Sequence, residues 1–128
     1  MRDGGGVPRE PIAITRHPAF ARELAMLRRS DPREHAALRN AIRKLESEGP
    51  RLGYPWSSAV RGATTPGLRE LRPRAGRSRQ RALYAWSEGV LILLALAPEA
   101  GHSPHAFREA VRQAGLRLAR HDDRGRST

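Results

Sequence analysis

Apolar residues recur at helical spacing along two neighbouring segments, and each of these segments begins with a proline. Pro18 and Pro32 suit the first turn of a helix, where the missing N–H has no hydrogen bond to lose. Asp31 and Glu34 have the spacing of a capping box. The pattern predicts an αα-hairpin that ends at Gly49. Its buried stripes are Phe20, Leu24 and Leu27 in the first helix, and Leu38, Ala41, Ile42 and Leu45 in the second.

The middle of the chain has the alternating pattern and the turn residues of β-strands. Three strand candidates cover Leu68–Arg74, Ser78–Trp86 and Val90–Ala97, and each short gap between them contains a glycine that suits a tight turn. The last candidate is apolar on both faces, which predicts a central, buried strand. A further short strand is predicted over Pro11–Thr15, at a sheet edge because its proline has no N–H to donate.

A third helical stripe lies near the C-terminus, after the cap-and-proline pair Ser103-Pro104. Together the elements predict an α+β fold, in which a small twisted antiparallel sheet packs against the helical hairpin. The sheet would contain the N-terminal strand and the three-strand meander. We expect a flexible lead at residues 1–10, one domain over residues 11–121 and a disordered tail at residues 122–128. The stripe of the last helix is Phe107, Val111, Ala114 and Leu118.

Between the hairpin and the meander, residues 51–67 contain repeated glycines and prolines, and they are predicted to form a long loop. Two aromatic residues, Tyr54 and Trp56, lie in this loop. They could stack on RNA bases, but aromatic side chains between a helix and a sheet more often close the edge of a core. We therefore expect both rings to pack against the core.

Composition narrows the possible functions. The chain has 128 residues, no cysteine, and 24 Lys and Arg against 13 Asp and Glu, a formal charge of +11. The missing cysteines exclude disulfide scaffolds and thiolate chemistry, and the excess of positive charge indicates a polyanionic partner. The longest apolar run is far shorter than the ~20 residues of a membrane helix. Since the first residues also lack a secretory signal, we expect a soluble, cytoplasmic protein.

The positive charge is concentrated in the meander. Residues 61–81 contain seven arginines and a single acidic residue, Glu70. Alternation along two paired strands would place several of these arginines in one patch, which indicates a nucleic-acid surface. The alternative is a solvated strand face in an arginine-rich protein. The arginines are Arg61, Arg69, Arg72, Arg74, Arg77, Arg79 and Arg81.

Titratable residues gather between the last predicted strand and the last helix. Glu99, His102 and His105 lie there, where a carboxylate and histidines can move protons and helix amides can hold a phosphate. The alternative is a polar loop with two surface histidines, and spacing alone favours it. No third ligand lies at a recognisable spacing from the histidine pair, so we expect no metal.

The order of elements, with Leu68-Arg69-Glu70-Leu71-Arg72 and Arg81-Ala82-Leu83-Tyr84, resembles the RelE/HigB superfamily of bacterial type II toxins, and above all its phage-derived, HigB-like branch. The likeness runs from about Leu24 to His121. It implies a small twisted antiparallel sheet against helices. It also implies metal-independent mRNA cleavage on translating ribosomes, and neutralisation by a cognate antitoxin, commonly a helix-turn-helix protein of the HigA type.

Carried over by position, the resemblance places Arg81 at the strand arginine that stabilises phosphate charge, with Arg72 on the neighbouring strand. His102 falls near the acid–base position that follows the last strand. Two positions differ from relatives: this chain has Pro98-Glu99 where a lysine pair is usual, and Phe107 where some relatives have a catalytic tyrosine.

The resulting hypothesis is an endoribonuclease toxin that needs no cofactor. Arg72 and Arg81 would hold the charge of the reacting phosphate, while His102, with Glu99 or His105, would move protons. The remaining arginines of residues 61–81 would bind RNA on the ribosome, with no membrane involved. Two alternatives stay open: a non-enzymatic toxin of the same fold that acts on another target such as gyrase, and a basic RNA-binding module.

Overall fold

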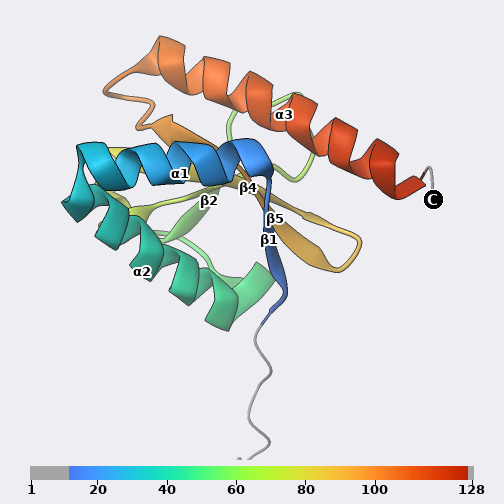
Figure 1. Cartoon of the computed structure of the whole chain (residues 1–128), viewed down its shortest axis with the longest axis horizontal. Coiled ribbons are helices and arrows are strands. Elements are labelled where there is room, and N and C mark those ends of the chain that lie inside the picture. Colours follow the sequence, from blue (N-terminus) through green and yellow to red (C-terminus); the bar gives the residue numbers. More distant parts are fainter. Residues whose placement is uncertain (1–11, 127–128) are drawn as a thin grey trace, which may run out of the picture.

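The structure is a computed structural model that describes residues 12–126, and the lead predicted at residues 1–10 lies outside the described residues. Three helices and one five-stranded sheet make up the fold, with strand order β1-β5-β4-β3-β2 (Figure 1). The helices are α1 (Pro18–Ser30), α2 (Pro32–Glu48) and α3 (Pro104–Arg126). The strands are β1 (Ile14–Arg16), β2 (Ser57–Ala59), β3 (Arg69–Leu71), β4 (Gln80–Ser87) and β5 (Val90–Pro98), and 3₁₀ turns cover η1 (Gly49–Arg51) and η2 (Pro73–Gly76).

The predicted α+β class and the antiparallel meander β3-β4-β5 are confirmed. The expected all-antiparallel sheet is wrong in one respect, because β1 pairs parallel with β5 from Leu91 to Leu93. A parallel neighbour requires a long crossover connection, and the hairpin and meander between the two strands supply one. β1 is an edge strand, as predicted, and covers Ile14–Arg16; Pro11, at the start of the predicted strand, lies outside the described residues.

A fifth strand lies inside the segment predicted as a loop. β2 pairs antiparallel with β3, and Ser58 faces Glu70 in the register. Its sequence, Ser-Ser-Ala, lacks the β-branched and aromatic residues that indicate strands. The pairing with β3 therefore comes from tertiary contacts rather than from local preference.

The helical hairpin covers one face of the sheet. The predicted starts at Pro18 and Pro32 are confirmed, and the Asp31 carboxylate accepts a hydrogen bond from the Glu34 backbone N–H at 3.2 Å. All seven stripe residues are buried, and they pack on Leu91 and Leu93 of β5 and on Ala82 and Tyr84 of β4. The hairpin core is the set Phe20, Leu24, Leu27, Leu38, Ala41, Ile42 and Leu45 with those strand residues.

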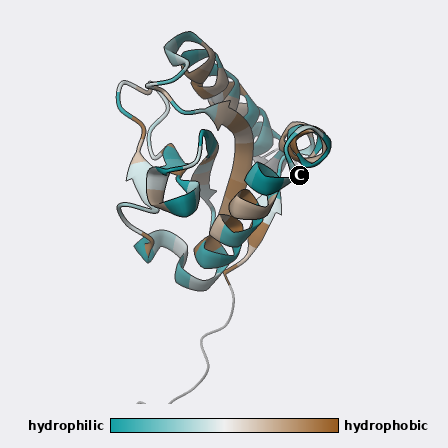
Figure 2. Ribbon diagram, turned by 90° about the vertical axis from the view of Figure 1, so that its left-hand side faces the viewer, coloured by the Kyte–Doolittle hydropathy of each residue, from teal (hydrophilic) through white to brown (hydrophobic). Residues whose placement is uncertain are grey.

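Helix α3 covers the opposite face. Ile92 and Leu94 alternate with the residues beneath the hairpin and pack against α3, as expected for a strand that is apolar on both faces. Figure 2 shows the hydrophobic stretch of the sheet running between the helices. α3 continues to Arg126, so residues 122–126 are helical, contrary to the predicted tail, and residues 127–128 lie outside the described part.

The free part of the β5 edge, beyond β1, is held by side chains. The backbone N–H of Leu96 donates to Glu23 Oε1 at 2.9 Å, and Arg117 Nη1 donates to the Leu94 carbonyl at 2.7 Å. Glu23 and Arg117 also form an ion pair at 2.9 Å. This contact joins α1, β5 and α3, and it occupies part of the strand edge that β1 leaves open.

Candidate functional site

A cleft of about 600 Å³ opens between the start of α3, strand β3 and the segment around Tyr54. It lies on the α3 face of the sheet, at the end of the strands that α3 leaves uncovered. Its lining includes six charged residues: the arginines Arg61, Arg72, Arg81 and Arg108, and the glutamates Glu70 and Glu99. Hereafter this space is called the cleft. It brings together three of the predicted catalytic residues, Arg72, Arg81 and Glu99.

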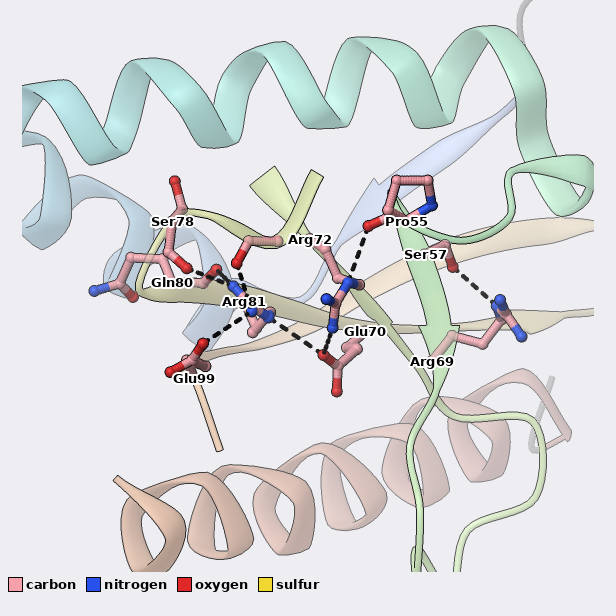
Figure 3. Close-up of polar contacts among 10 residues, drawn as sticks. Pro55, Ser57, Arg69, Glu70, Arg72, Ser78, Gln80, Arg81 and Glu99 are labelled. Atoms are coloured by element: carbon pink, nitrogen blue, oxygen red, sulfur yellow. Dashed lines mark hydrogen bonds and ion pairs between the residues drawn. The ribbon is translucent and has the colours of Figure 1, made fainter. Parts of the chain in front are cut away.

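Arg81 lies at the inner end of the cleft and is only 2% exposed. Its Nε donates to Glu70 Oε1 at 3.2 Å. Its Nη1 donates to the carbonyls of Ser78 and Gln80, at 2.6 and 3.0 Å, and Nη2 donates to the Gly76 carbonyl at 3.2 Å (Figure 3). Nη2 also lies 3.5 Å from Glu99 Oε2. Every nitrogen of this guanidinium therefore has a partner within the protein.

The chain around Arg81 explains why those carbonyls point towards it. Arg74 and Ala75, in η2, adopt left-handed φ angles of 55° and 56°, and the turn folds back over the start of β4. Left-handed non-glycine residues are costly and persist where surrounding contacts hold them. The hydrogen bonds that Arg81 donates to Gly76 and Ser78 are such contacts. Arg81 thus holds η2 in place.

Arg72 uses only some of its hydrogen-bond donors within the protein. Its Nε donates to the Pro55 carbonyl at 2.9 Å, and Nη1 donates at 3.1 Å to the same Glu70 oxygen that Arg81 uses (Figure 3). Its guanidinium also lies over the ring of Tyr54, 5.2 Å from the ring centroid. Within residues 12–126 Nη2 of Arg72 makes no hydrogen bond, so this side chain keeps donors that a ligand can use.

The two aromatic residues of the predicted loop have different environments. Trp56 packs against the hairpin core, as expected, with Lys44 Nζ 4.6 Å from its ring centroid. Tyr54 is 77% exposed and lines the cleft, so the expectation that it closes the core edge is wrong. The chain turns between them, with a cis Tyr54-Pro55 peptide. Only one of the two rings is directed towards the core.

Glu99 follows β5 and contributes to the start of α3. Its backbone carbonyl accepts hydrogen bonds from the N–H groups of His102 and Ser103, while its side chain is 39% exposed at the wall of the cleft. His102 and His105 are exposed and belong to the segment that forms this wall, but neither side chain lines the cleft. The structure therefore brings Glu99 to the arginines without the two histidines.

The predicted arginine patch is divided among several surfaces. The expected alternation stops at Leu71, where β3 ends, and η2 directs Arg74 towards α2, where it pairs with Glu34 at 2.7 Å. Arg69 donates to Ser57 Oγ, which also contacts the hydroxyl of the buried Tyr84. Two further exposed arginines of the set, Arg77 and Arg79, do not line the cleft.

Arg61 and Arg108 have the opposite character to Arg81. Both are exposed, both line the cleft, and neither has a hydrogen-bond or ion-pair partner among the described residues. Arg108 is not among the predicted site residues, because the apolar stripe is the main signal in the sequence of the last helix. One signal was available: Arg108 follows Ser103-Pro104 by about one helical turn, so it lies near the same helix start as Glu99.

No group of three potential metal-binding side chains occurs in residues 12–126. No helix in the same range is both long and apolar enough to cross a membrane. Burial and neighbouring arginines lower the pKa values of His17 and His35, neither of which lines the cleft. The charged side chains that line the cleft are arginines and glutamates.

Comparison with known proteins adds evidence of ancestry. A sequence profile described as "Phage derived protein Gp49-like" matches residues 25–97, which include Arg61, Glu70, Arg72 and Arg81. The chain is also 39% identical over 83 residues to a protein of Mycobacterium tuberculosis named "Putative toxin HigB2". That match covers 63% of this chain and 41% of the relative, so the chain spans about two fifths of the relative's length. The resemblance to the phage-derived, HigB-like branch is confirmed.

Proposed function

The chain belongs to the Gp49-like family of phage-derived proteins, and from this premise we propose that it is the toxin of a type II toxin–antitoxin pair. The name of the HigB2 relative supports this proposal. Its partner would be a cognate antitoxin, of the helix-turn-helix, HigA-like type that the resemblance implies. We further propose that the toxin cleaves mRNA, and that it acts on translating ribosomes.

One observation carries the cleavage proposal. In the cleft, two exposed arginines without partners among the described residues, Arg61 and Arg108, lie with a partly exposed carboxylate, Glu99. Unpaired guanidinium groups bind phosphate oxygens in bidentate fashion, and a carboxylate can accept a proton. The combination suits a substrate that carries a phosphate next to a hydroxyl group that must lose its proton to react, and RNA is such a substrate.

In the proposed reaction, the ribose 2′-oxygen forms a bond to the adjacent phosphorus while the bond from phosphorus to the 5′-oxygen breaks. The Glu99 carboxylate takes the proton of the 2′-hydroxyl. Arg61, Arg72 and Arg108 bind the non-bridging phosphate oxygens, on which negative charge accumulates. The products are a 2′,3′-cyclic phosphate and a 5′-hydroxyl, so no external reactant is needed.

The leaving 5′-oxygen must gain a proton. His102 is proposed as its source, with His105 as the alternative, since both lie in the segment that forms one wall of the cleft. Neither lines the cleft in the free protein, so RNA would have to pass over this wall for the transfer to occur.

Arg81 is proposed to act through its neighbours. Its contacts to Glu70, Glu99 and the carbonyls of Gly76 and Ser78 engage all three nitrogens, so a direct bond to phosphate would have to replace one of them. The simpler role is to position Glu99 and, through Glu70, Arg72. Arg81 would then be a positioning residue, and direct stabilisation of the phosphate charge would belong to Arg72 together with Arg61 and Arg108.

The test is to express the protein from an inducible promoter, to measure cell growth and to map the 5′-ends of cellular RNA. We expect growth arrest with new 5′-hydroxyl ends in mRNA. Glu99→Gln should lower cleavage by purified protein about 100-fold or more while RNA binding is retained, because only proton transfer is removed. Arg61→Gln with Arg108→Gln should weaken binding and cleavage together. Arg43→Gln, an exposed arginine of α2 on the other face, is the matched control.

Other outcomes identify the alternatives. Growth arrest without RNA cleavage, accompanied by gyrase-dependent DNA damage, would identify a non-enzymatic toxin of the same fold. RNA binding with neither arrest nor cleavage would identify a basic RNA-binding module. Cleavage that is unaffected by Glu99→Gln would overturn the assignment of the base while leaving the nuclease proposal in place.

A further inference from the structure

A second hollow adjoins the cleft. It measures about 580 Å³ and lies between α3 and residues 61–67, the connection from β2 to β3. The two spaces share Arg61, Phe107 and Arg108 as lining residues, so they lie next to each other along α3. We call the second hollow the side pocket. A ligand that binds Arg61 and Arg108 from the cleft can therefore reach the side pocket without leaving the protein surface.

The walls of the side pocket differ from those of the cleft. Phe107, Val111 and Leu116 supply apolar surface from α3, and Thr64 and Thr65 supply hydroxyl groups from the opposite side. Leu116 is 43% exposed. The pocket also includes Arg112, whose Nε and Nη2 donate to Glu109 at 3.1 and 2.7 Å and are thereby occupied. Apolar surface with a few polar groups is typical of pockets that bind small molecules.

A glycine in α3 allows the connecting segment to approach the helix. A Cβ atom built on Gly115 would lie 2.5 Å from Thr65 Oγ1, closer than any real Cβ contact. Glycine lowers the stability of a helix when it lies in the helix interior. Its effect here is to let Thr65 lie directly against α3, which sets the width of the side pocket on that side.

We propose that the side pocket binds one unstacked nucleobase of a single-stranded RNA whose phosphate lies between Arg61 and Arg108. This inference rests on the proposed function and specifies its substrate. The base faces would contact the apolar side chains, and the base edge would reach Thr64 and Thr65. Since the unpaired arginines lie where the two spaces meet, the phosphate joining two nucleotides would be held at that junction. A base within a duplex cannot leave its stack at low cost, which selects single strands.

The experiment measures binding of a short single-stranded RNA with 2′-O-methyl groups, which prevents cleavage. Leu116→Trp fills the side pocket from an exposed position. We expect it to weaken binding about tenfold, in line with the value of one stacked base. The slope of log K against log salt concentration should not change, because the phosphate contacts persist. Met26→Trp, at another exposed apolar position on α1, should have no effect.

A second arm identifies the base. A series of RNAs, each with one abasic nucleotide at a different position, is compared with the intact RNA. The wild-type protein should bind about tenfold more weakly when the abasic site is at one particular position and equally well when it is elsewhere. The RNA that is abasic at that position should bind Leu116→Trp as tightly as intact RNA does, because the two changes remove the same contact. Thr65→Val, nearly identical in shape, should alter the preference among the four bases at that position.

Several results would contradict the inference. Equal affinity of Leu116→Trp and wild type for intact RNA would overturn the inference, and so would additive losses from the variant and the abasic site. A reduced salt slope would show that the tryptophan blocks phosphate contacts and would also overturn it. If the wild-type protein fails to bind RNA, the proposed function itself is wrong. If Leu116→Trp weakens binding of the antitoxin and leaves RNA binding intact, the side pocket is a protein-binding site.

Discussion

The two faces of the sheet are covered differently, and the difference determines where chemistry is possible. On one face, α1 and α2 bury an apolar core that includes Phe20, Leu38 and Leu45, each with no exposed surface. On the other face α3 packs on β5 and β4, and the charged cleft opens between the start of α3 and β3. One helix in place of two thus leaves room for a binding site.

Polar residues on the α3 face also divide into two kinds. Arg81 is buried and uses its donors on its own chain, whereas Arg61 and Arg108 are exposed, with no partner in the described range. The same residue type therefore supports the structure in one place and can bind a ligand in another. The following predictions test this division and the contrast between the two faces.

The largest effect is expected for Arg81→Ala. Removing this buried guanidinium takes away one of the two arginine partners of Glu70 and leaves several carbonyls without their donor, and breaking such a buried contact costs about 3–5 kcal/mol. Urea denaturation should show this loss of unfolding free energy. Arg61→Ala, in the same cleft, should change stability by no more than about 0.5 kcal/mol. Equal effects of the two variants would remove the distinction between structural and available arginines.

Ile42→Ala tests the other face. Ile42 is buried in the hairpin core, and truncation to alanine should reduce the unfolding free energy by about 2–5 kcal/mol. Below its unfolding temperature the variant should bind RNA as the wild type does, because the sheet separates Ile42 from the cleft. Weaker RNA binding by the folded variant would show that the two faces are coupled.

Gly76→Ala should have an intermediate effect. Gly76 has φ +96°, and a Cβ there would lie 2.5 Å from Nη2 of Arg72. Left-handed strain should cost about 1–3 kcal/mol, and the clash should displace Arg72 from the cleft. Gly89→Ala is the matched control, since φ is +84° but no atom lies within 4 Å of the added carbon. Both variants should lose stability, and only Gly76→Ala should lose RNA affinity. Equal affinities would show that Arg72 does not contact RNA.

The smallest effect concerns pH. His17 caps α1, where its Nδ1 accepts a hydrogen bond from Ala19 at 3.0 Å. Burial, followed by the charges of Arg117 and other nearby residues, lowers the pKa of His17 below its ordinary value of 6.5. The unfolded chain therefore binds the proton more readily. The stability due to this group is complete above about pH 6.5 and is lost as the pH falls towards the lower, folded-state pKa.

His17→Asn keeps a capping acceptor but cannot titrate. Urea midpoints measured from pH 8 to pH 5 should fall less steeply for this variant than for the wild type. The His17→Asn variant should still lose some stability as the pH falls, because burial and nearby arginines also lower the pKa of His35. Identical pH profiles for wild type and variant would show that His17 does not contribute.

Much of the fold was predictable from short-range patterns. Helices α1, α2 and α3 each begin at a proline, which the sequence predicted. The strand Val90–Pro98 has apolar residues on both of its faces, which predicted a buried strand. β2 was not predictable, because three small residues have little preference for a strand until β3 lies beside them. The parallel direction of β1 was missed for the same reason, since no local residue determines which strand an edge strand joins.

The site was predictable in its residue types and only partly in its geometry. The sequence identified Arg72, Arg81 and Glu99, and the structure places all three in the cleft. It also predicted one continuous arginine patch, which η2 divides when it turns Arg74 towards Glu34, 40 residues away in the chain. Tyr54 and Trp56 lie two residues apart, yet they have opposite environments.

By itself, the sequence determined the helix hairpin, the meander, the strongly basic character and the family, because these depend on residue type and on spacing over a few positions. Only the tertiary structure decided which arginines are available. The partners of Arg81 come from β3, from η2 and from the residue after β5, and those of Arg61 and Arg108 are lacking within residues 12–126. The charge of a guanidinium is a property of the residue, whereas its free hydrogen-bond donors depend on every segment that folds around it.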